Sequence, residues 1–368
     1  MKTTIRTSVL YDRFSCLGAD CPQNCCYGWK IPVDEESEEK YRRERSITGL
    51  RACLAVHGRE NRLFNRLTLR CPMLDPDGLC ALQKKRGEGF LPAVCRVYPR
   101  EWANLGTFVE RTLDLSCIHA AEIYLEAASE PDGGLAMREE TGLWEEPRSG
   151  TNDDPEFLEE LTGRREEILA GLMDGGIATA EDFDTYLYGL ADAQKRRQDE
   201  ILRVEAHGVN RIRMFPFSVM LLNELMSTSF YEDHLRLRAP GLYRMCRRYY
   251  KMFDRLSEIE GQKKLDAMFA RFLTEEDGIP VQDYVRYFAY CLQRTFFATY
   301  EDYSLLRRVE EALVHVNVLL LLETLAREAG VPMTVRERAS MISAYEKRVF
   351  HNSDVLRAMV KCVTDRLV

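Results

Sequence analysis

Residues 14–31 read FSCLGADCPQNCCYGWKI, and four of these eighteen residues are cysteines. Glycine and proline turns separate the thiols, and such turns let several sulfurs converge on one point. Residues 71–100 continue the pattern, because they combine further cysteines with many turn-forming residues. A segment with so little regular structure needs something to hold it, and a bound metal would do so. Residues 1–128 are therefore predicted to form an irregular, cysteine-rich metal-binding module.

The residues alone leave the kind of metal open. Structural zinc is usually held by paired C-x2-C knuckles, and that pairing is absent here. The adjacent pair Cys25 and Cys26, with long irregular spacings around it, suits an iron–sulfur cluster better, and zinc is the alternative. Disulfides are disfavoured because no export signal is visible and thiols stay reduced in the cytosol. Three further cysteines are expected to pack as small apolar side chains in helices: Cys246, Cys291 and Cys362.

The rest of the chain reads as helical. Residues 129–155 are rich in proline, glycine and acidic residues, and are expected to be a linker or surface excursion. Beyond them, apolar residues recur at three- and four-residue spacing. Helices are expected over 156–174, 179–207, 216–228, 242–256, 281–299, 305–329, 334–349 and 353–367. The predicted fold is mainly α, with the cysteine-rich module followed by an all-helical domain over 156–368.

Composition excludes several classes of protein. The chain has 368 residues with 45% hydrophobic and 30% charged residues, which is ordinary for a globular protein. A formal net charge of -8 disfavours bulk electrostatic binding of nucleic acid, which needs a basic surface. The longest apolar stretch is too short to cross a bilayer. We expect a cytoplasmic protein that binds neither nucleic acid nor membrane.

The cysteine motifs carry a resemblance to a known family. The run at 14–31, with CPML at 71–74, GLC at 78–80, CRVYPR at 95–100 and LSC at 115–117, resembles the flagellin lysine-N-methylases. That family lies within a broader group of cysteine-rich, zinc- or iron-chelating proteins. A histidine–asparagine pair near the C-terminus, His351 and Asn352, also matches. The motifs cover about the first third of the chain.

The resemblance implies an enzyme and a set of metal ligands. It implies an S-adenosylmethionine-dependent methyltransferase that carries a [4Fe-4S] cluster and modifies lysines of flagellin or another lysine-bearing protein. Four thiols are enough for one such cluster. The matched thiols are eight of the first nine cysteines, with Cys53 left out: Cys16, Cys21, Cys25, Cys26, Cys71, Cys80, Cys95 and Cys117.

Three residues are candidates for cofactor binding. Arg96 and Arg100 stand close to Cys95, and a guanidinium can hold a carboxylate in a two-pronged fork or screen a negatively charged cluster. The alternative is a pair of surface arginines. Trp29 follows the first cysteine run and would shield the metal from water, or serve as ordinary core.

Three other residues are catalytic candidates. A lysine side chain, with a pKa near about 10.4, has to lose its proton before it attacks a methyl donor. The site must then remove water from the amine or offer a base. The candidates are the titratable residues closest in sequence to the cysteines: Asp75, Asp77 and Tyr98.

A second class of function stays open. The sequence has no glycine-rich nucleotide-binding loop, so a Rossmann methyltransferase is disfavoured. The C-x3-C-x2-C motif of radical S-adenosylmethionine enzymes is also missing, because Gly28 stands where the third cysteine would be. The alternative is a non-catalytic zinc- or iron-binding protein whose helical domain binds a partner.

Overall fold

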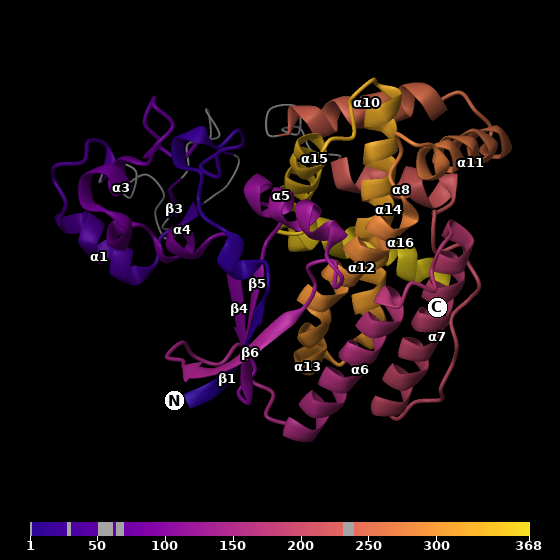
Figure 1. Ribbon diagram of the computed structural model, residues 1–368, viewed down its shortest axis with the longest axis horizontal. Coiled ribbons are helices and arrows are strands. Elements are labelled where there is room, and N and C mark those ends of the chain that lie inside the picture. The colour runs from indigo at the N-terminus through magenta and orange to yellow at the C-terminus, as the bar shows by residue number, and fades with distance from the viewer. Residues whose placement is uncertain (1, 28–30, 51–61, 64–69, 231–238) are drawn as a thin grey trace.

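The computed structural model describes residues 2–27, 31–50, 62–63, 70–230 and 239–368. Most of these residues are helical, and the prediction of a mainly-α fold is confirmed. Figure 1 shows the cysteine-rich segments as a small lobe beside a larger helical body, with a narrow sheet near their junction. Within the described residues, no helix is long and apolar enough to cross a membrane.

The small lobe has short elements around a core of its own. Helix α1 (Glu35–Arg43) begins where the side chain of Asp34 accepts a hydrogen bond from the backbone of Ser37, which is the cap that the sequence suggests. Strands β2 (Ile31–Pro32) and β3 (Arg62–Leu63) pair, and helices α3 (Ala81–Arg86) and α4 (Ala93–Val97) follow. Their shared core is small: Ile31, Val33, Tyr41, Ile47, Leu50, Cys71, Met73, Leu82 and Leu91.

A four-stranded sheet lies next to this lobe, in the order β4-β5-β1-β6. Its strands are β1 (Lys2–Ser8), β4 (Arg100–Asn104), β5 (Phe108–Leu113) and β6 (Met137–Leu143). Strand β1 runs parallel to β5 and antiparallel to β6. Strand β4 runs antiparallel to β5, and its first residue, Arg100, lies opposite Leu113.

Strand β6 lies inside the stretch that was expected to be a linker. The sequence of this strand has no apolar alternation, because as an edge strand it leaves most of its side chains in water. The stretch after it is also anchored. The carboxylate of Glu301 accepts hydrogen bonds from the backbone of Thr151 (3.1 Å) and of Asn152 (3.1 Å).

The helical body surrounds α14 (Leu305–Glu328), whose side chains are buried on nearly every face. Helices that pack on it include α7 (Ala180–Ile201), α10 (Pro240–Phe253), α12 (Val281–Thr295), α15 (Val335–Arg348) and α16 (Ser353–Leu367). Outside this group lie α5 (Ile118–Glu126), α6 (Pro155–Met173), α8 (Val219–Phe230) and the short α13 (Thr299–Asp302). Helix α5, which follows the last N-terminal cysteine, packs against α15.

One helix was missed at the sequence level. Helix α11 (Glu258–Thr274) begins at Ser257, whose side chain and that of Glu260 cap each other's backbone N–H groups. The serine–glutamate spacing is a sequence signature of a helix start. It is followed at once by Gly261, a weak helix former, which obscures the pattern.

Candidate metal and cofactor site

All eight matched cysteines line one cavity of about 400 Å³. The thiols come from segments as far apart in the sequence as the first cysteine run and the start of α5. By contrast, the three cysteines of the helical body, Cys246, Cys291 and Cys362, are buried there, as expected of small apolar side chains. Cys53 lies outside the described residues.

The thiols of the cavity belong to two different cores. Cys71 is buried in the core of the small lobe, and Cys26, Cys80 and Cys95 pack against that core. Cys21 and Cys117 instead pack against the main core of the helical body. The backbone N–H of Cys71 donates to the carbonyl of Cys26 over 2.7 Å, which joins the first cysteine run to the turn-rich segment.

Burial and mutual proximity disfavour ionisation of these thiols. Burial raises the pKa of Cys95 to about 12, and the negative charges of Cys25 and Cys80 raise it further. Burial likewise raises the pKa of Cys117 to about 11. Thiolates packed this closely need a positive partner, and a bound metal centre is a strong one.

The spacing of the sulfurs suits a cluster better than a single zinc ion. Tetrahedral zinc with Zn–S bonds near 2.3 Å puts its sulfurs about 3.8 Å apart. Among the described residues, no three thiol sulfurs lie within 4.8 Å of one another. A cubane holds its ligands on separate iron atoms and so accepts sulfurs that are farther apart. The donor set therefore fits a [4Fe-4S] cluster.

The basic and aromatic candidates lie at the same cavity. Arg96, Tyr98 and Arg100 are all among the residues that line it. Arg100 donates to the carbonyl of Phe14 over 2.7 Å, and its guanidinium lies 5.1 Å from the centre of the Phe14 ring. Trp29 lies outside the described residues.

Tyr98 stays protonated. Burial, together with the negative charge of Asp114, raises the pKa of its hydroxyl well above the ordinary value. The hydroxyl lies 3.0 Å from the side-chain oxygen of Ser116. A phenol in this state can give and accept hydrogen bonds, but it is a poor base.

The structure does not bring Asp75 and Asp77 to the cavity. Neither residue lines it, and both carboxylates form ion pairs with Lys84, over 2.9 and 2.5 Å. Asp77 also accepts a hydrogen bond from the backbone of Leu79. Within the described structure, the two aspartates shape the turn between Cys71 and Cys80.

Lys347, on α15, is a residue that the sequence analysis missed. Burial lowers the pKa of its ammonium, whereas the nearby thiols of Cys25, Cys117 and Cys21 raise it. A cation in this position offsets the negative charge that metal-binding thiolates carry. No sequence signal pairs it with the cysteines, because Lys347 is an ordinary residue in a charged helical segment.

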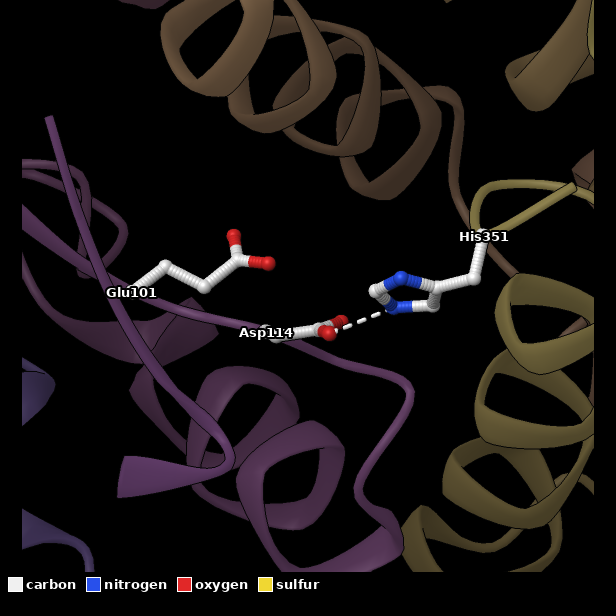
Figure 2. Close-up of side chains that lie close together, drawn as sticks. All are labelled: Glu101, Asp114 and His351. Atoms are coloured by element: carbon white, nitrogen blue, oxygen red, sulfur yellow. Dashed lines mark hydrogen bonds and ion pairs between the residues drawn. The ribbon is translucent and has the colours of Figure 1, made fainter. Parts of the chain in front are cut away.

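A second cluster of charged groups lies behind Tyr98. Figure 2 shows the side chains of Glu101, Asp114 and His351 pointing toward one another from β4, from the end of β5 and from the turn between α15 and α16. His351 Nε2 lies 2.6 Å from Asp114 Oδ2. The matched histidine near the C-terminus thus meets the segment that carries the LSC motif.

Arg294 neutralises this cluster. The ligand atoms of Glu101, Asp114 and His351 lie within 4.8 Å of one another, which is a spacing that could hold a metal ion. However, the buried guanidinium of Arg294 contacts Glu101 (2.8 Å) and Asp114 (3.2 Å), as well as Glu346 (3.2 Å). Since these carboxylates already share a fixed cation, the cluster is an ion-pair network and carries no metal proposal.

Comparison with known proteins finds relatives for part of the chain. It is 31% identical over 147 residues to a protein named Lysine-N-methylase from Salmonella typhimurium, covering 38% of this chain and 35% of the relative. It is 29% identical over 138 residues to the flagellar biosynthetic protein FliU from Salmonella muenchen, covering 35% of this chain and 79% of the relative. The chain thus spans about a third of the length of the first relative. No family model and no solved structure matches.

These findings confirm the relationship that the cysteine motifs suggested. A second protein named Lysine-N-methylase, from Salmonella choleraesuis, is 30% identical over 147 residues. The chain is therefore related to the flagellin lysine-N-methylases over somewhat more than a third of its length.

Proposed function

We propose that the protein is an S-adenosylmethionine-dependent protein-lysine N-methyltransferase with a cysteine-held [4Fe-4S] cluster. Its proposed substrate is flagellin or another lysine-bearing protein. The observation that carries the proposal is that eight cysteines from distant segments line one cavity in a relative of proteins named lysine-N-methylase.

Four thiols are the best candidates to hold the cluster. Cys26, Cys71, Cys80 and Cys95 share the core of the small lobe, so one rigid unit carries all four. Cys16, Cys21 and Cys117 lie at the side of the cavity that joins the helical body. Lys347 would balance part of the negative charge of the thiolates.

The cavity also offers groups that suit S-adenosylmethionine and a lysine side chain. When bound, S-adenosylmethionine supplies the methyl group. Arg96 and Arg100 would bind its carboxylate, as guanidinium groups do in two-pronged pairs. The largely apolar wall, which includes Phe14, Ile31 and Leu91, keeps water from the amine and so favours its uncharged, nucleophilic form.

The experiment joins metal analysis to a methylation assay. Anaerobically purified protein should contain iron and acid-labile sulfide. With methyl-labelled S-adenosylmethionine, a reductant and purified flagellin, it should add label to lysine-containing peptides in steps of one methyl mass. Cys71→Ser should lose iron and activity together, and Cys246→Ser, a change at a buried cysteine outside the cavity, is the matched control.

Two outcomes would contradict the proposal. Stoichiometric zinc without sulfide in anaerobic protein would exclude the cluster. Iron-replete protein that neither binds S-adenosylmethionine nor labels any lysine would favour the non-catalytic metal-binding alternative. The second result would leave the cluster standing and remove the enzyme.

A further inference from the structure

A line of hydrogen bonds leads from the cavity into the helical body. Tyr98 lines the cavity, and its hydroxyl lies 3.0 Å from Ser116 Oγ. Ser116 Oγ in turn donates to Asp114 Oδ2 over 2.8 Å, and His351 Nε2 meets the same carboxylate oxygen over 2.6 Å. The line joins residues that are 18, 2 and 237 positions apart in the sequence.

The sheet explains why these groups meet. Because β4 and β5 are antiparallel with Arg100 opposite Leu113, the residues just before β4 lie beside those just after β5. The backbone N–H of Asp114 donates to the carbonyl of Pro99 over 2.8 Å, which fixes this arrangement. The backbone of Ser116 is held separately, since Ser343 Oγ donates to its carbonyl over 2.7 Å.

The far end of the line is a fixed negative charge. Burial alone would raise the pKa of Asp114, but the guanidinium of Arg294 and the hydrogen bond from His351 lower it well below its ordinary value. Asp114 is 1% exposed and also accepts a hydrogen bond from the backbone of Ser116 over 2.8 Å. An ionised carboxylate can only accept hydrogen bonds.

This charge fixes the direction of each hydrogen bond. Ser116 has one hydroxyl proton, and the ionised Asp114 takes it. The oxygen of Ser116 must then accept, so the proton of Tyr98 points toward Ser116. The oxygen of Tyr98 is left to act as an acceptor toward any further partner.

We propose that Tyr98 presents its oxygen to the cavity as a hydrogen-bond acceptor for the N–H groups of a primary amine, and that Ser116, Asp114 and His351 are positioning residues that hold it so. The inference rests on the proposed function for the identity of the amine as a lysine side chain. The orientation of Tyr98 itself follows from the hydrogen bonds. It assigns to the C-terminal histidine a role in a site made mainly by the N-terminal third of the chain.

The first test is binding, without methyl transfer. The probe is Nα-acetyl-lysine amide, titrated into iron-loaded protein. Tyr98→Phe and Ser116→Ala should each weaken its binding about tenfold, the effect of losing one hydrogen bond to a charged group. The double variant should bind as weakly as Tyr98→Phe alone, because the two residues act through one oxygen. Losses that multiply in the double variant would overturn the proposal.

The second test separates positioning from stability. His351→Ala should weaken binding of the probe about fivefold or more, and His351→Gln should restore most of it, because the glutamine amide can still donate to Asp114. The control is Glu110→Gln. Glu110 forms a similarly buried ion pair with Arg165 (2.7 Å), and neither residue lines the cavity. This control should lower the melting temperature without weakening the binding of the probe.

The outcomes keep this inference apart from the proposed function. If the probe binds as described but no lysine is methylated, the amine site stands and the methyltransferase does not. If His351→Ala only lowers the melting temperature, as Glu110→Gln does, the histidine is a structural residue and the proposal fails. If methylation proceeds and Tyr98→Phe binds the probe like the wild type, the proposal also fails.

Discussion

The carboxyl of Glu346 should make the protein less stable as the pH rises from about 4.5 to about 8. Glu346 is fully buried on α15, and burial raises its pKa from 4.5 to about 8 despite the opposing effect of Arg294. Arg294 cannot offset the burial fully because it is shared with Asp114 and Glu101. The folded state therefore prefers the protonated carboxyl, whereas the unfolded chain releases this proton near its ordinary pKa.

The sign and size follow from proton linkage. A group whose pKa is raised on folding contributes stability that is complete below the unfolded value and is lost as the pH passes through the folded value. The interval from 4.5 to about 8, at about 1.4 kcal/mol for each pH unit, sets an upper limit of about 5 kcal/mol. Glu346→Gln removes the titration but keeps an oxygen for Tyr287, which donates to Glu346 Oε1 over 3.1 Å.

Urea unfolding at several pH values between 4.5 and 9 measures the effect. Glu346→Gln and the wild type should be close in stability at pH 4.5, and the variant should gain steadily relative to the wild type up to about pH 8. Glu310→Gln is the comparison, because burial raises the pKa of Glu310 to about 7 and its gain should level off about one pH unit earlier. A difference between Glu346→Gln and the wild type that does not change with pH would refute the reasoning.

Three further predictions concern the cavity. Serine in place of any thiol of the small-lobe core should lower bound iron by half or more, as measured by metal analysis, while Cys291→Ser and Cys362→Ser keep it; equal iron in all would contradict the ligand set. Asp75→Asn and Asp77→Asn should keep methylation within about twofold and cost at most about 1 kcal/mol in urea unfolding, because their ion pairs with Lys84 are exposed and lie off the cavity. Arg100→Lys should weaken S-adenosylmethionine binding about tenfold in calorimetry without loss of iron, because lysine lacks the two-pronged fork, and unchanged affinity would remove Arg100 from the cofactor site.

The sequence was most informative where local chemistry is unusual. Cysteines clustered among glycine and proline turns predicted that distant segments meet, and all eight matched cysteines line one cavity. The helices were also predictable, since their apolar residues recur with the helical period and must be buried on one face. Both signals are carried by residue type and spacing within a short stretch.

The sequence was least informative where partners are distant. Asp114 and His351 are 237 positions apart, and neither residue type predicts the other. Edge strand β6 shows no apolar period because it has little apolar surface to bury. Lys347 becomes notable only when α15 is placed next to the thiols. Such contacts depend on how the elements pack, which a single sequence does not record.

Buried charges tie the two predicted domains together across the boundary at residue 128. Glu110 and Asp114 come from the N-terminal side, and their partners Arg165 and Arg294 come from the helical body, at 2.7 and 3.2 Å. Removing one member of such a pair leaves an uncompensated buried charge and costs roughly 3–5 kcal/mol. Strand β1 also needs β6, which lies beyond the boundary. The thiol-lined cavity and the helical body therefore depend on each other for folding, and His351 reaches Asp114 only when both are in place.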